Sequence, residues 1–335
     1  MFSISIVFVL LACLKHYSCQ FTEKIVETST PGINALINLS PTLNLYLSPS
    51  QIGTIDISNN YNTIKTITTT PGLSALSQNV IPLEEDKFIL ICSDAFAVVL
   101  DTNGNERGNK ITYDAAGINP INTKCQGFVN QNTLFIYFFI PDPDEPTKYF
   151  DYYFFQYNLD RTTYAISGQK KFMIQKTFYD GYLESLLIQC AYINKSKKTF
   201  CAYFDDSFIS AGFVSSNFDS IVNEVNTTSE AFEVAMLQLS DEKVIVFGIN
   251  DLLKYHEFIF DDNSFTFTQQ FLTEREISLI DLLSLSKLNE HSFFLSSTNG
   301  SDINITSISI DDINNVDSTF SKDFLENAQN PIQKI

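Results

Sequence analysis

Short apolar and polar runs alternate along most of the chain, and one arrangement of them recurs. An apolar run is followed by a short polar segment and then by a run rich in Phe, Ile and Val. The copies read INLSPTLNLYLS, IPLEEDKFILIC, QGFVNQNTLFIYFF, CAYINKSKKTFCAYF, MLQLSDEKVIVFG and LSKLNEHSFFLSS. Two apolar runs around a short polar link are typical of a β-hairpin.

The hairpins recur at a nearly constant spacing. The first apolar residues after the turns are Leu43, Phe88, Leu134, Phe200, Val244 and Phe293, at intervals of 45, 46, 66, 44 and 49 residues. A second, weaker pair of predicted strands follows several of these hairpins, for example AFAVVL and NKITYD around DTNGNERG. The pattern therefore predicts a unit of about 45 residues with four strands.

Four strands per unit, repeated in series, resemble the blades of a β-propeller. The turn DTNGN after AVVL is similar to the Asp-x-x-Gly turns of quinoprotein-like repeats, and WD40 and kelch-like proteins share the architecture. The recurring Trp of quinoprotein-like repeats is absent because the chain has no Trp. The resemblance implies an all-β fold with a single propeller, with six four-stranded blades favoured over seven. It implies no cofactor site.

Two other β architectures fit parts of the pattern. A pair of β-sandwiches explains the strands but not their even spacing, and a unit of about 45 residues is long for one coil of a β-solenoid. A propeller explains both the strands and their even spacing.

The N-terminus predicts a secretory leader. Residues 4–14, ISIVFVLLACL, form an apolar run of 11 residues, which suits a signal-peptide core and is short for a membrane-spanning helix. A buried first strand is the alternative, and it lacks an obvious partner strand close behind it. We expect cleavage near Cys19–Gln20, so that residues 1–19 are a signal peptide and residues 20–335 form the propeller.

Composition narrows the partners and the compartment. The 30 Phe and 15 Tyr residues favour β-structure, and the formal net charge of -18 disfavours nucleic acid as a partner. No later stretch is apolar enough to span a bilayer. The mature chain is therefore expected in the secretory-pathway lumen or outside the cell, as a secreted protein or an ectodomain.

Cysteine parity agrees with an oxidising compartment. Outside the leader there are four cysteines, which allow three pairings: Cys92, Cys125, Cys190 and Cys201. Cys190 faces Cys201 if Ile193 pairs with Lys198, and is offset from it if Ile193 pairs with Phe200. The favoured pairing is Cys190 with Cys201, and Cys92 with Cys125, which lie in consecutive units.

Five Asn-x-Ser/Thr triplets predict glycan acceptors in a secreted chain. They begin at Asn38, Asn194, Asn226, Asn299 and Asn304.

The chain offers no clear metal or histidine-based site. An EF-hand loop beginning at Asp101 needs Gly at position 6 and Glu at position 12, where this chain has Glu106 and Thr112. DTNGNERG is therefore interpreted as a turn. His256 and His291 stand in no catalytic or zinc motif, so both are assigned structural or surface roles.

Carboxylates are the remaining candidates for catalysis. Asp142, Asp144, Glu145 and Asp151 gather in the enlarged unit, and Asp pairs recur at turns at 205–206, 261–262 and 311–312. The aromatic run at 149–157 is interpreted as a strand buried on both faces. We predict no catalytic residue, metal or cofactor, and a role as a binding module for an unknown protein or glycan. A glycan hydrolase with carboxylates in a central funnel and a structural coat or matrix protein are the alternatives.

Overall fold

The structure is a computed structural model of the 335-residue chain. It describes residues 4–10, 22–28, 35–40, 43–48, 51–56, 63–67, 78–84, 86–92, 96–112, 125–142, 144, 149–177, 188–206, 208–227, 233–249, 253–271, 281–289, 292–298, 303–309 and 317–322. Side chains are described mainly between residues 80 and 267.

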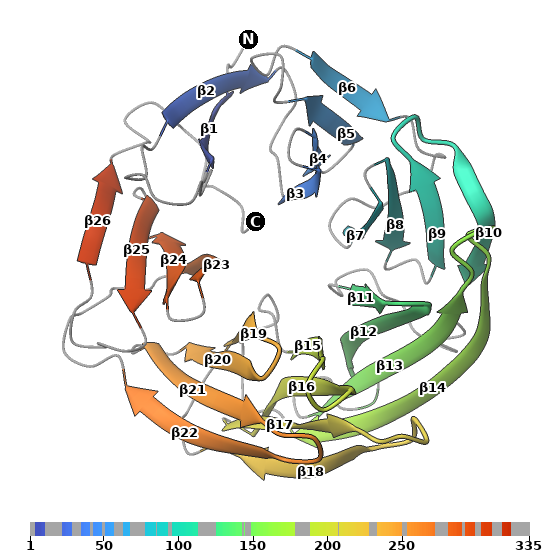
Figure 1. The fold of residues 1–335 in the computed structure, drawn as a ribbon, viewed down its shortest axis with the longest axis vertical. Helices are drawn as coiled ribbons and strands as arrows, with labels where there is room; N and C mark the ends of the chain where they lie inside the picture. Colours follow the sequence, from blue (N-terminus) through green and yellow to red (C-terminus); the bar gives the residue numbers. More distant parts are fainter. Residues whose placement is uncertain are drawn as a thin grey trace.

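Strands joined by turns make up the described residues. They form six antiparallel sheets of four strands and one sheet of two strands. Within each larger sheet the strands follow chain order, so each is a meander. The sheets are arranged around a ring like the blades of a propeller (Figure 1). The predicted all-β propeller fold is confirmed.

We number the four-stranded sheets as blades I to VI in chain order. Blade I contains β3 (Ala35–Ser40), β4 (Leu43–Ser48), β5 (Gln51–Asp56) and β6 (Thr63–Ile67). Blade II contains β7 (Gln78–Glu84), β8 (Lys87–Cys92), β9 (Phe96–Asp101) and β10 (Glu106–Thr112). Blade III contains β11 (Gln126–Asn130), β12 (Thr133–Pro141), β13 (Tyr149–Leu159) and β14 (Ile166–Thr177). Blade IV contains β15 (Ile188–Ile193), β16 (Lys198–Asp205), β17 (Phe208–Val214) and β18 (Ile221–Asn226). Blade V contains β19 (Glu233–Ser240), β20 (Lys243–Ile249), β21 (Leu253–Phe260) and β22 (Phe265–Phe271). Blade VI contains β23 (Asp281–Asn289), β24 (Ser292–Thr298), β25 (Ile303–Ser309) and β26 (Asp317–Lys322).

The two-stranded sheet takes a seventh position in the ring, between blades VI and I (Figure 1). It pairs β1 (Ile4–Leu10) with β2 (Thr22–Thr28). The sequence argument that no partner strand follows residues 4–14 closely was therefore wrong, because β2 supplies one in the full-length chain. Cleavage of the leader stays a prediction.

The first strand of each blade lies nearest the centre of the ring and the fourth lies at its rim (Figure 1). First strands of neighbouring blades are in contact, as for β3 with β7 and for β15 with β19. The six residues that the sequence placed directly after hairpin turns all lie in second strands. The spacing of the turns therefore predicted the blades correctly.

The middle strands of the blades with described side chains are buried on both faces, whereas the outer strands β10, β14 and β18 are largely exposed. Along β9, Phe96, Val98 and Leu100 pack with blade I, whereas the intervening Ala97 and Val99 pack with blade III. Because successive side chains of a strand point to opposite faces, each blade contributes to two cores.

The aromatic run at 149–157 follows the same rule, as predicted. Its strand β13 turns Phe150, Tyr152 and Phe154 toward blade IV, and turns Phe155 and Tyr157 toward blade II. At the next seam, the ring of Phe200 on β16 lies 5.0 Å from that of Phe258 and 4.9 Å from that of Phe260 on blade V. Such aromatic pairs add specific geometry to the burial of apolar area.

One face of the ring carries the first and third turns of each blade, because strands 1 and 3 of a meander run in the same direction. We call it the turn face. Hydrogen bonds join these turns across blades. The guanidinium of Arg161 in blade III donates to the carbonyl oxygens of Gln131 in its own blade and Leu83 in blade II, at 3.0 and 3.3 Å. Lys195 N in blade IV donates to Asp241 O in blade V at 3.1 Å.

Two third-turn aromatics with positive φ, Tyr164 and Phe218 (both φ 59), reach back to the preceding blade. The Tyr164 hydroxyl donates to Glu84 Oε2 at 2.9 Å. The Phe218 ring meets those of Phe135 and Phe172 edge-on, with centroids 5.8 and 5.0 Å apart. A bulky residue rarely adopts this backbone region, so the contacts must hold it there.

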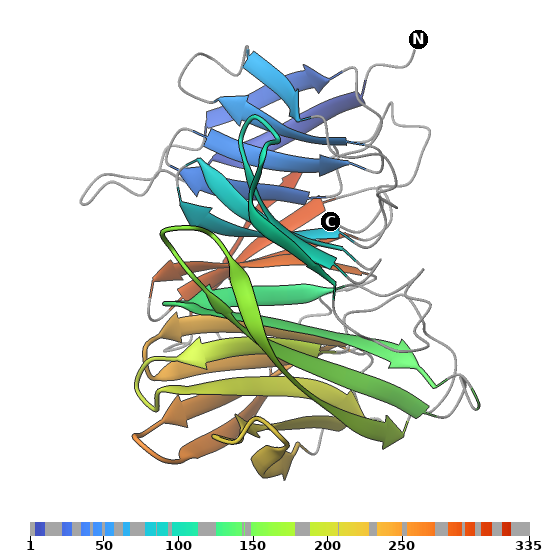
Figure 2. The same ribbon diagram turned by 90° about the vertical axis from the view of Figure 1, so that its right-hand side faces the viewer.

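The outer strands β10 and β14 are also joined, on the side of the ring that faces the viewer in Figure 2. The Asn109 side chain donates to Ile166 O at 3.0 Å and accepts from Ile166 N at 2.8 Å. Its neighbour Gly108 has φ +69, and a Cβ there would collide with the carbonyl oxygen of Tyr164. Only glycine fits this approach without strain.

We expect Gly108→Ala to destabilise the fold by about 2–3 kcal/mol, because it adds both a backbone clash and an unfavourable φ. Asn109→Ala should cost about 1–2 kcal/mol through the loss of two hydrogen bonds. Urea unfolding of the purified variants measures both.

The matched control is Glu106→Ala on the same strand, where the side chain is exposed. Its free energy of unfolding should stay within about 0.5 kcal/mol of the parent. An equal loss of unfolding free energy in all three variants would argue against a specific contact between the outer strands of blades II and III.

Candidate functional site

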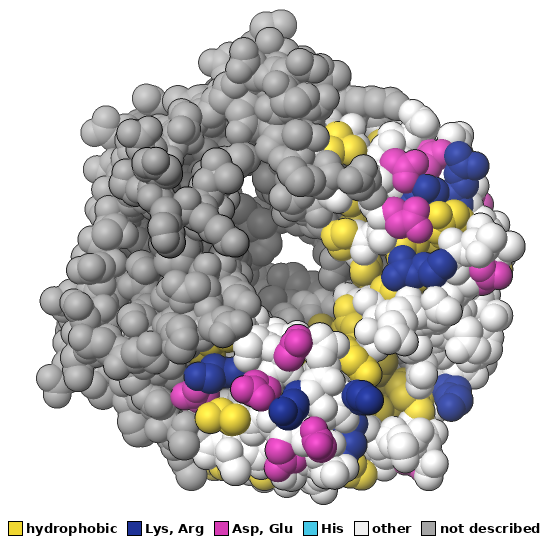
Figure 3. All heavy atoms as spheres, viewed as in Figure 1, with side chains coloured by type: hydrophobic (Ala, Val, Ile, Leu, Met, Phe, Trp, Pro, Cys, Tyr) yellow, Lys and Arg dark blue, Asp and Glu magenta, His cyan; other side chains and the backbone are white. Residues whose placement is uncertain are grey.

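The centre of the ring is open, and charged side chains of both signs are interspersed on the described part of the face in Figure 3. Hydrophobic side chains are visible between them and beside the opening. The inner strands with described side chains include β7, β11, β15 and β19. Their described side chains at 80–84, 126–130, 188–193 and 234–240 include one carboxylate, that of Glu84 at the end of β7. Glu84 accepts a hydrogen bond from the Tyr164 hydroxyl and pairs with Lys87, so it takes part in contacts between turns.

The predicted acidic segment lies away from the centre of the ring. Asp142 follows β12, and Asp151 lies on the third strand of blade III. The Nε2 of Gln175, on the outer strand β14, donates to Asp142 Oδ2 at 2.6 Å and to Asp151 Oδ1 at 3.2 Å. Asp144 is exposed, and Glu145 lies outside the described residues. Burial, with the nearby charge of Asp142, raises the pKa of Asp151.

In the part of the chain with described side chains, a group of charged and polar residues lies between blades III and IV. We call it the seam cluster, and it consists of Lys176, Tyr203, Asp205, Ser210, Glu224 and Asn226. Lys176 Nζ contacts Asp205 Oδ2 at 2.9 Å and Glu224 Oε1 at 2.6 Å. It also lies 5.3 Å from the centre of the buried Tyr203 ring.

Hydroxyl and backbone groups extend the seam cluster. The Ser210 hydroxyl lies 2.8 Å from Asn226 Oδ1 and 3.3 Å from Asp205 Oδ2. Asp206 N donates to Thr177 O at 3.0 Å, so the backbones of the two blades are joined beside the ion pairs.

The protonation states of the seam cluster suit adhesion between blades better than catalysis. Burial opposes the charge of Lys176, but its hydrogen bonds to Glu224 and Asp205 outweigh burial and raise its pKa. Burial and the nearby carboxylates raise the pKa of Tyr203 as well. At neutral pH the cluster therefore holds a protonated amine and a neutral phenol, and neither is an activated nucleophile.

DTNGNERG forms the turn between β9 and β10, as predicted. Asp101 Oδ1 accepts from the backbone N–H groups of Asn103 and Asn105 at 2.8 and 3.0 Å. Its Oδ2 accepts from Asn105 Nδ2 at 3.0 Å and Arg107 Nη2 at 2.7 Å. The buried carboxylate thus binds its own turn, as a capping Asp does.

The same use of Asp recurs in two other blades. Asp160 accepts from the backbone of Thr162 and Thr163, and Asp261 from that of Asn263 and Ser264. The Asp pair at 261–262 was therefore correctly assigned to a turn, whereas residues 311–312 lie outside the described residues.

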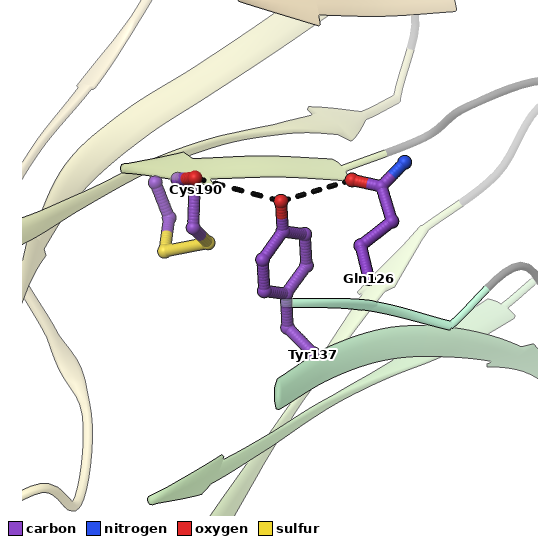
Figure 4. Close-up of a disulfide and its surroundings, with 4 residues drawn as sticks. Gln126, Tyr137 and Cys190 are labelled. Atoms are coloured by element: carbon purple, nitrogen blue, oxygen red, sulfur yellow. Dashed lines mark hydrogen bonds between the residues drawn. A yellow bond between two sulfur atoms is a disulfide. The ribbon is translucent and has the colours of Figure 1, made fainter. Parts of the chain in front are cut away.

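Cys190 and Cys201 face each other on β15 and β16 and form a disulfide in the structure. The register is the one with Ile193 opposite Lys198. Figure 4 shows the neighbouring Tyr137, whose hydroxyl donates to Gln126 Oε1 at 2.9 Å and lies 3.5 Å from the Cys190 carbonyl oxygen.

The second cysteine pair stays a prediction. Cys125 is buried among side chains of blades II and III. The Cys92 side chain lies outside those that the structure describes, although its backbone ends β8.

Two glycan acceptors have described side chains, and both are exposed on blade IV. Asn194 lies in the turn between β15 and β16, and Asn226 ends β18. Asn38 and Asn304 are described by backbone only, in β3 and β25, and Asn299 lies outside the described residues. Glycosylation at all five stays a prediction.

His256 is fully buried on β21, with its ring 6.5 Å from that of Phe267. This position agrees with the structural role assigned from the sequence. His291 lies outside the described residues.

Sequence reasoning missed the seam cluster. Lys176 shares its strand with two other lysines, and its partners Asp205 and Glu224 follow 29 and 48 residues later. The available signal was the repeat itself, which places the outer strand of one unit beside the next unit.

No protein-family model matches the chain, and no curated protein matches it. Among solved structures, it is similar to the β-propeller domain of Cps50 (Swd1) from Myceliophteria thermophila. The TM-score is 0.54 at 8% identity, over 83% of this chain and 84% of that one. The chain is thus a β-propeller, and a likeness at this identity extends to the fold alone.

Two other solved structures have lower TM-scores. The Dos1 propeller matches with a TM-score of 0.46 and 11% identity, over 85% of this chain and 68% of that one. Hsv2 from Kluyvelomyces marxianus matches with a TM-score of 0.44 and 11% identity, over 88% of this chain and 100% of that one.

We expect Asp101→Asn to lower the free energy of unfolding by about 2 kcal/mol at pH 7, because the charge-assisted hydrogen bonds of the turn are lost. Hydrogen bonds outweigh burial and hold the pKa of Asp101 well below its ordinary 3.8. The contribution of the Asp101 carboxylate to the free energy of unfolding is therefore complete above about pH 4, and it is lost as the pH falls toward the folded-state pKa. Urea unfolding between pH 3 and pH 7 measures it.

Asp262→Asn is the control, since this exposed acid follows the capping Asp261. It should change stability by less than about 0.5 kcal/mol at every pH tested. A loss at Asp101 that does not shrink below about pH 4 would contradict the assignment.

Replacing Lys176 by Met should destabilise the fold by about 1–3 kcal/mol, because Asp205 and Glu224 are left half-buried without their cation. The double variant Lys176→Met/Glu224→Gln should recover part of this loss. Lys170→Met on the same strand is the control, with an exposed lysine. Thermal unfolding of the parent and the three variants distinguishes a specific contact between blades III and IV from a general effect of lost charge.

Proposed function

We propose that this chain is a secreted or luminal β-propeller that serves as a binding module for a protein or glycan partner. The observation that carries the proposal is the register of β15 and β16, which sets Cys190 opposite Cys201 and joins them. Disulfides persist in oxidising compartments, and the apolar run at residues 4–14 offers a route into one.

Binding, rather than catalysis, suits the way the described polar groups are used. Lys176, Asp205 and Glu224 join two blades, and Asp101 solvates its own turn. These contacts hold adjacent blades and turns in place, as in rigid scaffolds that present binding surfaces on their connecting segments.

The partner is expected to be protein or glycan. A chain with a formal net charge of -18 repels phosphate backbones, so no nucleic acid is proposed. Among the described residues no helix is both long and apolar enough to cross a membrane.

The test uses the full chain expressed with its own leader in a eukaryotic secretory host. The mature protein is collected from the medium and its N-terminus and disulfides are mapped under non-reducing conditions. It is then cross-linked to the extracellular fraction of its source cells, with an unrelated secreted propeller of similar charge as control. We expect Gln20 as the first residue, a linked Cys190–Cys201 peptide, and a partner cross-linked specifically to this chain.

Three results would replace the proposal. Retention inside the cell with reduced Cys190 and Cys201 would remove the compartment assignment. Hydrolysis of a glycan panel by the purified chain would favour the hydrolase. Self-assembly into large particles in sizing experiments, without a cross-linked partner, would favour a structural coat or matrix protein.

A further inference from the structure

The turn between β15 and β16 buries a hydroxyl group, that of Ser196. It lies in the four-residue turn that follows Ile193 and precedes Lys198, where β15 meets β16. The residue is 6% exposed, and its Oγ makes no hydrogen bond to the described part of the chain. Buried hydroxyl groups almost always have a partner, so this one requires an explanation.

The turn is held by its neighbours without the help of Ser196. Lys195 N donates to Asp241 O at 3.1 Å, and Asn194 Nδ2 donates to Asp241 Oδ1 at 2.7 Å. Burial of an unpaired hydroxyl lowers stability relative to an apolar side chain of similar size. Alanine would fill the same space without this penalty, so packing does not account for a serine.

The sequence position supplies a use for the hydroxyl before folding. Ser196 is the third residue of Asn194-Lys195-Ser196, and N-glycosylation requires Ser or Thr at that place. In the nascent chain the hydroxyl is accessible, and it becomes buried only when blade IV folds. We propose that Asn194 carries an N-linked glycan and that Ser196 is a serine for this reason. The proposal rests on secretory entry of the chain.

The geometry at Asn194 accommodates the linkage. Its side chain is exposed, and one N–H of its amide is directed to Asp241. A glycosylated amide keeps one N–H, so the glycan and this contact between blades IV and V can coexist. In the transfer, Nδ2 attacks the anomeric carbon of a polyprenyl-diphosphate-linked oligosaccharide. The N–C bond forms, the C–O bond to phosphate breaks, the lipid diphosphate leaves, and the amide loses one proton.

The second exposed acceptor, Asn226, differs in its surroundings. Its Oδ1 lies 2.8 Å from the Ser210 hydroxyl within the seam cluster, and Thr227 is the middle residue of its triplet. Burial of Thr227 therefore carries no information about glycan acceptance. Asn226 serves as the internal comparison for occupancy.

The first measurement is site occupancy by glycopeptide mass spectrometry on the full chain secreted from a eukaryotic host. Asn194 should be occupied in the parent and in Ser196→Thr, and unoccupied in Ser196→Ala and Asn194→Gln. Occupancy of the other triplets should not change among these proteins. An empty Asn194 in the parent beside an occupied Asn226 or other acceptor would overturn the proposal and leave secretory entry intact.

The second measurement isolates the folded-state effect of the hydroxyl. Asn194→Gln and Asn194→Gln/Ser196→Ala both lack a glycan at this turn, so their Tm values are directly comparable. The double variant should have a Tm about 1–3 °C higher, because it no longer buries an unpaired hydroxyl. A lower Tm would show that the hydroxyl supports the fold, and the proposal would fail. Absence of glycan at every acceptor, together with reduced Cys190 and Cys201, would instead overturn the proposed compartment.

Discussion

Burial of both faces of the middle strands in blades II to V is the constraint on which the described structure depends. Phe96, Ala97 and their successors along β9 point alternately into two different cores, and β13 does the same with larger aromatic side chains. A single four-stranded sheet with two apolar faces has no stable form in water, so each blade requires its neighbours. Turn-face hydrogen bonds and the seam cluster act on this arrangement by fixing how adjacent blades are rotated against each other, which apolar contacts alone specify weakly.

The same constraint explains what the sequence could predict. Apolar runs around polar turns mark hairpins because strand and turn residues differ locally, so the second strands at Leu43, Phe88 and the later positions were found from spacing alone. The pairing of β15 with β16 stayed open because their turn is two residues longer than those of most other units, and either of two registers suited the pattern. The partner strand β2 was missed because it is polar on average and follows the apolar run only after a long connection.

The candidate sites were harder to predict because their members meet across blades. The structural role of Lys176 is evident only from its contacts with Asp205 and Glu224, and that of Asn109 only from its contacts with Ile166. The acids at 142–151 were noticed for their local density, yet the structure assigns Asp142 and Asp151 to a shared contact with Gln175 on the outer half of a blade. Local density of one residue type reports the composition of a segment, whereas a site depends on distance in space.

The side chain of Asn109 also determines how the outer strands of blades II and III are held together. Blades fan outward from the centre of a ring, so neighbouring sheets separate with increasing radius and their outer strands are ordinarily independent edges. By exchanging two hydrogen bonds with the backbone of Ile166, Asn109 behaves like one rung of a strand added to the edge of blade III. Blades II and III are therefore fastened at the circumference as well as at the hub.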